Sequence, residues 1–260
     1  MMTLNPHSYL HIRTVWVNRF LAIGLAVSLF PALSGCRKPV KLHPAQVSGF
    51  NDEFDGAKNA SPWLQFKQQT FEQARSGGEL RIIPNQHVVW WKADSGPMLY
   101  KRVKGNFRVS TRVRARSKKS PDRPPNSEYQ FGGLIARSPG SDETGRENYV
   151  FSVVGYRGKY LSVETKTTRN DESEVEGPTW DSGDAELRIC RINSTFVLLN
   201  RKIGSKEWKK AITYERRDLP PTLQVGPIAY SYAWKKVDLL ARFEYVRYSP
   251  VTAMKDCFAD

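Results

Sequence analysis

The stretch from Tyr129 to Tyr156 constrains the fold most, because it contains two apolar, β-like runs joined by a polar connection. Valine, isoleucine and aromatic residues in both runs favour strands. The connection, Ser138 to Gly145, contains the Ser, Pro, Gly and Asp residues of tight turns. The stretch therefore predicts the central hairpin of an antiparallel sheet. Inside the first run, Gly132-Gly133 predicts a bulge, or a place where another backbone or a ligand approaches closely.

Residues 105–116 alternate most cleanly between apolar and polar side chains. One face is expected to enter the core, and the other carries a ladder of guanidinium groups from Arg108, Arg112, Arg114 and Arg116. Because arginine presents a planar fork, this ladder fits a strip that binds carboxylate or phosphate groups. The alternative, which we favour, is a solvated outer face.

Further strands are predicted on both sides of the hairpin, and no segment shows a convincing helical period or an internal repeat. The polar residues 167–184 are expected to form a long loop. The sequence thus predicts an all-β fold, a two-sheet antiparallel sandwich over residues 49–250, followed by a tail over 251–260. The other strand candidates are 79–84, 87–92, 98–103, 159–166, 185–192, 195–201, 207–214, 223–230 and 238–248.

The beginning of the chain resembles the signal of a bacterial lipoprotein. A basic start precedes an apolar run over 20–32, which is too short for a membrane span of ~20 residues. Small residues then lead to Cys36, so we expect residues 1–35 to be a signal peptide and Cys36 to carry the lipid. Residues 36–48 are expected to be a basic tether. Because Arg37 and not Asp follows the cysteine, the expected location is the cell envelope, at the outer membrane.

The chain is strongly basic, with a net charge of +14. This balance favours polyanionic partners such as anionic polysaccharide or a phospholipid surface, and the alternative is a solvated basic surface that stays near anionic lipid. Export argues against nucleic acid, and no nucleic-acid-binding motif is present.

Three cysteines occur in the sequence. If Cys36 is lipidated, Cys190 and Cys257 remain as a pair in an oxidising compartment, which predicts a disulfide. The alternative is a buried thiol at Cys190 and a free thiol in the tail. Beyond the signal only His43 and His87 remain, so no Cys/His cluster with metal-binding spacing is expected.

Several segments together resemble the concanavalin A-like lectin/glucanase superfamily, and most closely its poorly characterised domains that are similar to the C-terminal domains of family-43 xylosidases. The resemblance covers nearly all of residues 48–250 and implies a jelly-roll sandwich. It rests on Phe50–Gly56, Trp63, Gly105-Asn106-Phe107, Phe131–Arg137, Asn148-Tyr149-Val150, Leu187-Arg188-Ile189, Trp208 and Ala241–Arg247.

The resemblance does not extend to catalytic residues. Glucanases of this superfamily carry a Glu-x-Asp-x-Glu strand, which places carboxylates on one face. The nearest segment here, Glu172 to Glu176, has Glu in the middle and is bracketed by turn residues, so we expect a solvated loop. Since no other enzyme motif is found either, we expect a protein without catalytic activity.

A binding module remains, and sugar sites combine aromatic platforms with polar side chains. One of Trp90 and Trp91 must face inward if their segment is a strand, whereas Trp180 is expected to be exposed. Arg137 and Asn148 are expected to share one rim. The candidate platforms are Trp90, Trp91, Tyr149, Tyr160 and Trp180, and the candidate polar contacts are Arg112, Arg137, Asn148, Glu164 and Gln224.

Asp52, Glu53 and Glu244 are a weak candidate for a calcium site, with a salt bridge or hydrogen-bonded pair as the favoured alternative. No other cofactor is expected. The function predicted is that of an envelope lipoprotein, attached to the membrane by its lipid, whose lectin-like domain binds anionic glycan without catalysis. The alternatives are a glycoside hydrolase or lyase with atypical carboxylates, and a structural envelope protein without a small ligand.

Overall fold

A computed structural model describes residues 41–56, 61–233 and 237–260. The predicted signal peptide, Cys36 and the first part of the tether lie outside the described residues. Among the described residues, no helix has the length and apolar character needed to cross a membrane.

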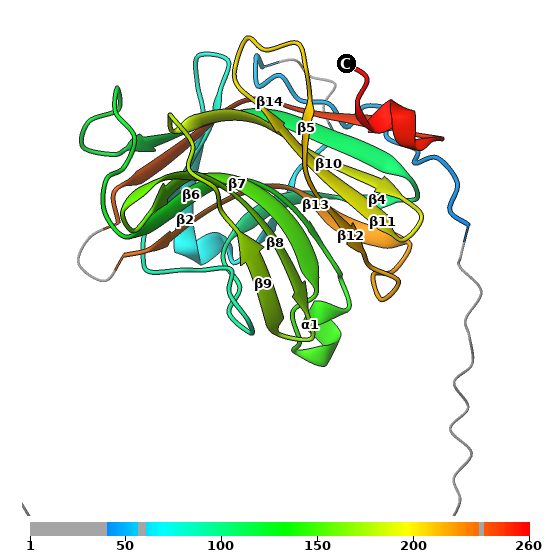
Figure 1. Ribbon diagram of the computed structural model, residues 1–260. Helices are drawn as coiled ribbons and strands as arrows, with labels where there is room; N and C mark the ends of the chain where they lie inside the picture. Colours follow the sequence, from blue (N-terminus) through cyan, green and yellow to red (C-terminus); the bar gives the residue numbers. More distant parts are fainter. Residues whose placement is uncertain (1–40, 57–60, 234–236) are drawn as a thin grey trace, which may run out of the picture. The chain divides into compact units, whose positions relative to one another are not determined.

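The described residues form two seven-stranded antiparallel sheets that pack face to face (Figure 1). This confirms the predicted all-β, two-sheet jelly-roll sandwich. The sheet that we call the β7 sheet has the order β1 (Leu64–Phe66), β4 (Met98–Lys104), β13 (Thr222–Tyr232), β6 (Tyr129–Arg137), β7 (Tyr149–Arg157), β8 (Tyr160–Arg169) and β9 (Glu172–Glu176). The sheet that we call the β5 sheet has the order β12 (Lys209–Glu215), β11 (Thr195–Arg201), β10 (Asp184–Ile192), β5 (Phe107–Ser117), β14 (Leu239–Pro250), β3 (Leu80–Pro84) and β2 (Phe71–Arg75).

The core lies between the two sheets, because each strand places every second side chain on its inner face. Strand β5 shows the predicted alternation: its apolar residues are buried in the core while its arginines lie on the opposite, partly exposed face. The predicted central hairpin is β6 and β7, joined by a connection that contains the short helix α1 (Ser141–Thr144). The core includes Phe107, Val113, Leu134, Val150, Leu187 and Phe243.

Gly132 and Gly133 lie in a regular part of β6, where the pairing with β7 continues without a shift in register. The bulge predicted there is wrong, and the close approach of other atoms is the correct explanation. A Cβ atom on Gly132 would lie 2.8 Å from the Cβ of Ala241 in the facing sheet, and one on Gly133 would lie 2.2 Å from the carbonyl oxygen of Ser152. A register shift occurs instead in β14, between Phe243 and Tyr245.

The prediction of a loop over 167–184 is wrong for residues 167–176, which form the end of one strand, a tight turn and a further strand. Strand β8 continues to Arg169, and β9 pairs with it as the edge strand of the β7 sheet. Asn170 and Asp171 join the two strands with φ values of 47° and 73°. Left-handed residues at both central positions are typical of a tight hairpin turn, and Asn and Asp adopt this conformation more readily than most residues. Because this turn brings residues 172–176 beside β8, the exposed acidic segment forms a strand.

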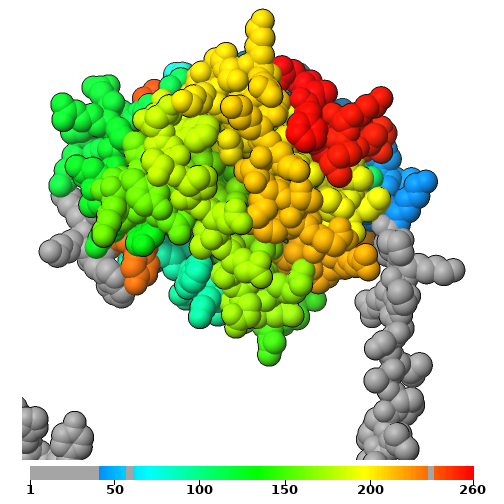
Figure 2. Space-filling view, viewed as in Figure 1, coloured from blue at the N-terminus to red at the C-terminus, as the bar shows by residue number. Residues whose placement is uncertain are grey.

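Both ends of the described chain pack on the sandwich. Within the segment predicted as a tether, the Ala45 amide donates to the Asn106 carbonyl oxygen at 2.8 Å, and Ala45 is buried. The C-terminal residues, red in Figure 2, include the 3₁₀ helix η2 (Met254–Cys257) and cover an apolar patch on β10 and β11. Cys190 and Cys257 form a disulfide there, with a Cα–Cα distance of 5.6 Å.

We expect the double variant Cys190→Ser/Cys257→Ser to lose about 4 kcal/mol of unfolding free energy. The two cysteines are 67 residues apart, and a cross-link closing a loop of that length restricts the unfolded chain by about this amount. Urea unfolding of the oxidised protein and of the variant measures the difference. Wild-type protein in reductant should match the variant. A difference below about 1 kcal/mol would show that the disulfide contributes little to stability.

Candidate functional site

The outer face of the β7 sheet, turned away from the β5 sheet, carries a row of side chains in register. Tyr232, Tyr129, Arg157 and Tyr160 lie directly opposite one another in the neighbouring strands β13, β6, β7 and β8. The three tyrosines are between 38% and 43% exposed. We call these four residues the tyrosine row. Large aromatic side chains at this exposure, side by side, form an apolar platform on the surface.

Residues 88–94, which we call the strap, cross the same face beside the tyrosine row. At one end, Val88 pairs with Ser231 of β13 through two backbone hydrogen bonds of 3.0 Å. At the other end, the Lys92 amide donates to Ser173 Oγ of β9 at 2.9 Å. The strap therefore connects two strands that lie far apart in the order of the sheet.

The strand predicted over 87–92 is wrong, because only Val88 and Trp91 make isolated β-bridges there. One of the two neighbouring tryptophans nevertheless faces inward. Trp90 is fully buried and packs edge-on against Tyr149, with 5.3 Å between the ring centroids. Trp91 is 39% exposed, and its ring lies 4.7 Å from Lys166 Nζ. Trp91 therefore remains a platform candidate, and Trp90 is part of the packing beneath the strap.

A hollow of about 430 Å³ lies between the strap and the tyrosine row. We call it the tyrosine hollow. Its rim is aromatic and its floor is charged, a combination typical of sites that bind ligands with flat apolar faces and many hydroxyl groups. It is lined by Val89, Trp90, Trp91, Asp94, Tyr129, Arg157, Glu164, Lys166, Val175, Tyr230 and Tyr232.

Glu164 is the buried carboxylate of the tyrosine hollow. Its Oε1 accepts a hydrogen bond from Arg157 Nη1 at 2.6 Å, and its Oε2 accepts one from the Tyr230 hydroxyl at 3.5 Å. Burial raises the pKa of Glu164, and the positive charges of Arg157 and Lys166 oppose this shift. A carboxylate in this position is held rigidly and can accept a hydrogen bond from a ligand.

Lys166 is a buried cation in the same floor. Its Nζ donates to the Trp90 carbonyl oxygen at 2.6 Å and lies 4.6 Å from the centre of the Phe151 ring. Burial lowers the pKa of Lys166 to about 8, against the attraction of Glu164. The contact ties the strap to β8 and places a titratable group in the floor of the hollow.

We expect the stability difference between the wild type and the variant Lys166→Met to depend on pH. The unfolded lysine keeps its proton up to a pKa of 10.5, whereas the folded one releases it above a pKa of about 8. The wild type should therefore gain stability relative to the variant, by ~3 kcal/mol, as the pH rises between these values. Urea unfolding at pH 7, 9 and 10.5 measures this.

The matched control for that experiment is Lys159→Met, in the exposed turn between β7 and β8. We expect it to change stability by less than about 0.5 kcal/mol at all three pH values. A pH-independent difference for Lys166→Met would contradict the assigned burial of the ammonium group.

Arg137 and Tyr149, both predicted to contact a ligand, are buried at the far end of the β6–β7 hairpin. Arg137 is 1% exposed: it donates to both oxygens of Glu147 at 2.8 Å and to Gln224 Oε1 at 2.8 Å. Asn148 is half-buried and accepts from the Asn170 amide at 3.0 Å. Arg137 and Asn148 therefore do not form the shared rim that we expected, because the α1 connection folds Glu147 back over the arginine.

We expect Arg137→Met to destabilise the protein by about 3–5 kcal/mol, because it leaves Glu147 as a buried carboxylate without its cation. The matched control, Arg146→Met, changes an exposed arginine of the same connection and should cost less than about 0.5 kcal/mol. Thermal or urea unfolding measures both. A loss below 1 kcal/mol for Arg137→Met would show that the ion pair is not an essential part of the packing.

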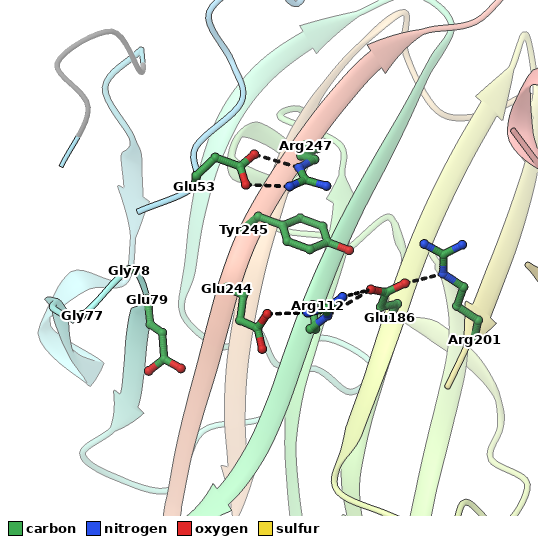
Figure 3. A pocket seen from close by; sticks show the side chains of 10 residues that line it. All are labelled: Glu53, Gly77, Gly78, Glu79, Arg112, Glu186, Arg201, Glu244, Tyr245 and Arg247. Atoms are coloured by element: carbon green, nitrogen blue, oxygen red, sulfur yellow. Dashed lines mark hydrogen bonds and ion pairs between the residues drawn. The ribbon is translucent and has the colours of Figure 1, made fainter. Parts of the chain in front are cut away.

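Arg112 lies on the other side of the molecule, on the outer face of the β5 sheet (Figure 3). It donates to Glu244 at 2.7 Å and to Glu186, which also pairs with Arg201. The register shift in β14 places both Glu244 and Tyr245 on this face. These contacts belong to a charged hollow of about 490 Å³.

The arginine ladder of β5 is thus largely neutralised by carboxylates from neighbouring strands. Arg114 pairs with Glu244 and Asp184, and Arg116 also pairs with Asp184. The structure gives no support to the anion-binding strip considered for this ladder. The aromatic residue that lines the charged hollow, Tyr245, is buried, so the tyrosine hollow, which has exposed rings, is the better candidate site.

The three carboxylates of the weak calcium candidate have separate partners, which agrees with the favoured alternative of a salt bridge or hydrogen-bonded pair. Asp52 accepts from Trp63 Nε1 at 2.8 Å, Glu53 pairs with Arg247, and Glu244 pairs with arginines of β5. No group of three or more His, Cys, Asp and Glu side chains that could hold a metal ion occurs in the part of the chain that the structure describes.

Trp180 is half-buried and packs against the core, and its Nε1 donates to the Asp184 carbonyl oxygen at 2.8 Å. The prediction of an exposed Trp180 is therefore wrong. Among the platform candidates, the structure brings Trp91 to the tyrosine hollow and Tyr160 to the end of the tyrosine row. Among the polar candidates it brings Glu164.

Sequence reasoning missed Tyr129, Arg157 and Tyr232. A signal was present, since Tyr129 and Tyr232 each lie two residues from a buried aromatic residue and so share its face of the strand.

Residues 172–176 turn their acidic side chains away from the hollow: Val175 lines it, and the alternation of a strand puts Glu174 and Glu176 on the other face.

The fold and this site define a class of protein: an all-β, two-sheet jelly-roll sandwich with an aromatic hollow on one outer face. No family model and no curated protein matches the chain. Solved structures do match. A functionally unknown protein from Saccharomyces cerevisiae has a TM-score of 0.60 at 14% identity, over 74% of this chain and 97% of that one.

Two other similar structures come from bacterial and phage proteins. The GH43 protein BlXynB from Bacillus licheniformis has a TM-score of 0.60 at 14% identity, over 78% of this chain and only 40% of that one. The CBM2 module of the evolved Dit of Lactobacillus casei BL23 phage J-1 has a TM-score of 0.53 at 9% identity, over 82% of this chain and all (100%) of the module. At these identities the likeness shows the fold alone.

Proposed function

We propose that the protein is a lipid-anchored protein of the bacterial envelope, at the outer membrane, whose sandwich binds carbohydrate, in particular anionic glycan, without hydrolysing it. The lipid anchor is proposed from the signal-like sequence before Cys36, and the observation that carries the carbohydrate-binding part of the proposal is the tyrosine hollow. Trp91, Tyr129 and Tyr232 are exposed around a floor that holds Glu164 and Arg157. Aromatic rings stack on the apolar faces of sugars, and fixed charged groups bind their polar substituents.

The similar structures support a carbohydrate ligand. A GH43 protein and a CBM2 module share the fold of this chain, although sandwiches of one architecture serve many functions. The hollow adds a specific argument, because it places platforms and polar groups together on one face.

Two observations favour an anionic glycan. The whole chain carries a net charge of +14, which attracts polyanions over a distance set by the salt concentration. At the site itself, Arg157 binds Glu164 through Nη1 and keeps 25% of its side chain exposed, in the middle of the tyrosine row. A guanidinium group at that place suits a sugar carboxylate.

The absence of hydrolysis is proposed from the arrangement of carboxylates. A retaining glycosidase needs two carboxyl groups ~5–5.5 Å apart on either side of the scissile bond. Among the described residues that line the hollow, the acids are Glu164, which Arg157 holds in an ion pair, and Asp94, which is exposed in the strap.

We expect Trp91→Ala and Tyr129→Ala each to weaken glycan binding at least about tenfold, since removing a central aromatic contact costs about 1.4 kcal/mol or more. The matched control is Phe258→Ala, which removes a ring of similar exposure, 42%, from the C-terminal segment. The measurement is a glycan array of the wild type at low and high salt, followed by titration of the variants. Equal binding by all four proteins would contradict the assigned site.

A hydrolase is the rival function, and an assay for cleavage of the bound polysaccharide distinguishes it from a binding protein without catalysis. One observation favours it, because burial raises the pKa of Glu164, as expected for a general acid. Release of reducing ends from a bound polysaccharide, abolished by Glu164→Gln, would establish the enzyme. If the wild type binds no glycan and cleaves none, both carbohydrate functions fail and the structural envelope protein remains.

A further inference from the structure

Another hollow, of about 540 Å³, lies beside the strap, on the side away from the tyrosine hollow. We call it the second hollow. It shares Val89 and Asp94 with the tyrosine hollow, so the two are neighbours separated by the strap. The remaining lining is mainly polar and comes from the segment around the 3₁₀ helix η1 (Gln68–Thr70), from the first residue of the strap and from residues that flank the strap: Lys67, Gln69, Thr70, Gln86, His87, Val88 and Ser95.

Aromatic rings lead from one hollow to the other. The His87 ring lines the second hollow and lies 4.6 Å from the Tyr232 ring, measured between centroids. Tyr232 lies 6.1 Å from Tyr129 by the same measure, and both line the tyrosine hollow. The pairing of Val88 with Ser231 fixes His87 beside the end of β13. The platform is therefore continuous around the strap.

The length of the platform exceeds a single sugar ring. Neighbouring strands are ~4.8 Å apart, so the tyrosine row spans ~14 Å from Tyr232 to Tyr160 across three strand spacings. His87 extends it beyond Tyr232. A ligand that contacts the whole platform must run across the strands and contain several units.

The second hollow offers groups that suit hydroxyl and carboxylate substituents. Gln69 and Gln86 are exposed, and each amide both donates and accepts hydrogen bonds. Lys67 Nζ donates to the Ser95 carbonyl oxygen at 2.6 Å. An ammonium group has three donors, so this contact leaves two for other acceptors. The hollow thus has polar contacts at the end of an aromatic platform.

We propose that the second hollow is a further binding site, which takes the next sugar units of the chain held in the tyrosine hollow. The ligand class is then a linear oligosaccharide or polysaccharide, bound along several units, and not a single sugar or a chain end. This inference rests on the proposed function and specifies the substrate of the same face.

Chain length tests the proposal. The probes are 1,4-linked galacturonic acid oligomers of two, four and six units, with 1,4-linked xylose oligomers of the same lengths as uncharged counterparts, titrated into the full-length protein. The wild type is expected to bind six units at least tenfold more tightly than two. The double variant Gln69→Ala/Gln86→Ala is expected to lose most of that gain, so that its affinity for six units falls at least fivefold and by more than its affinity for two.

The matched control is Gln73→Ala, an exposed glutamine of β2 outside both hollows, which should leave all affinities unchanged. If two and six units bind the wild type equally, or if the double variant shows no selective loss, the second site is overturned while the proposed function stands. If the wild type binds no oligomer of either series, the second site for these chains is overturned, and the carbohydrate function fails as well only if the glycan array is also negative.

Discussion

The packing of two sheets through their inner faces is the constraint on which the rest of this structure depends. Because the period of a strand is two, filling the core with one set of residues fixes the other set on an outer face. The β5 sheet uses its outer face for arginines, which find carboxylates on neighbouring strands. The β7 sheet uses its outer face for aromatic residues, which are too apolar to be left fully exposed and are partly covered by the strap.

The sequence was informative where the signal is local. Residues 107–115 alternate so regularly that the strand, its buried face and the arginine face follow from them, and Gly132-Gly133 correctly indicated a close approach. Strand β9 was missed because its alternating residues, Glu and Ser or Val, bury little, and because its existence depends on a turn whose two residues both adopt positive φ. The register shift beside Glu244 likewise depends on the pairing with β5, which no local pattern contains.

The site was less predictable for a related reason. Trp91, Tyr160 and Glu164 were chosen by residue type, and the structure places them on or beside one platform. Arg137 was chosen by the same criterion and is buried against Glu147. Glu147 lies at the far end of the β6–β7 connection, and the course of that connection could not be predicted from the sequence. The tyrosine row emerges only from register, because it brings together Tyr129 and Tyr232, which are far apart in the chain.

The strap shows why this face is a better site than the charged hollow. A cover that served packing alone would bury the aromatic residues of the β7 sheet completely with apolar side chains. This one buries Trp90 but leaves Trp91 and three tyrosines exposed, and it encloses Glu164 and Lys166, whose desolvation costs stability. Exposed rings beside buried charges are a poor solution for stability and a good one for holding a polar ligand with apolar faces. The charged hollow, by contrast, has no exposed ring among the described residues that line it, since its aromatic residue, Tyr245, is buried, so it lacks an apolar platform for a sugar.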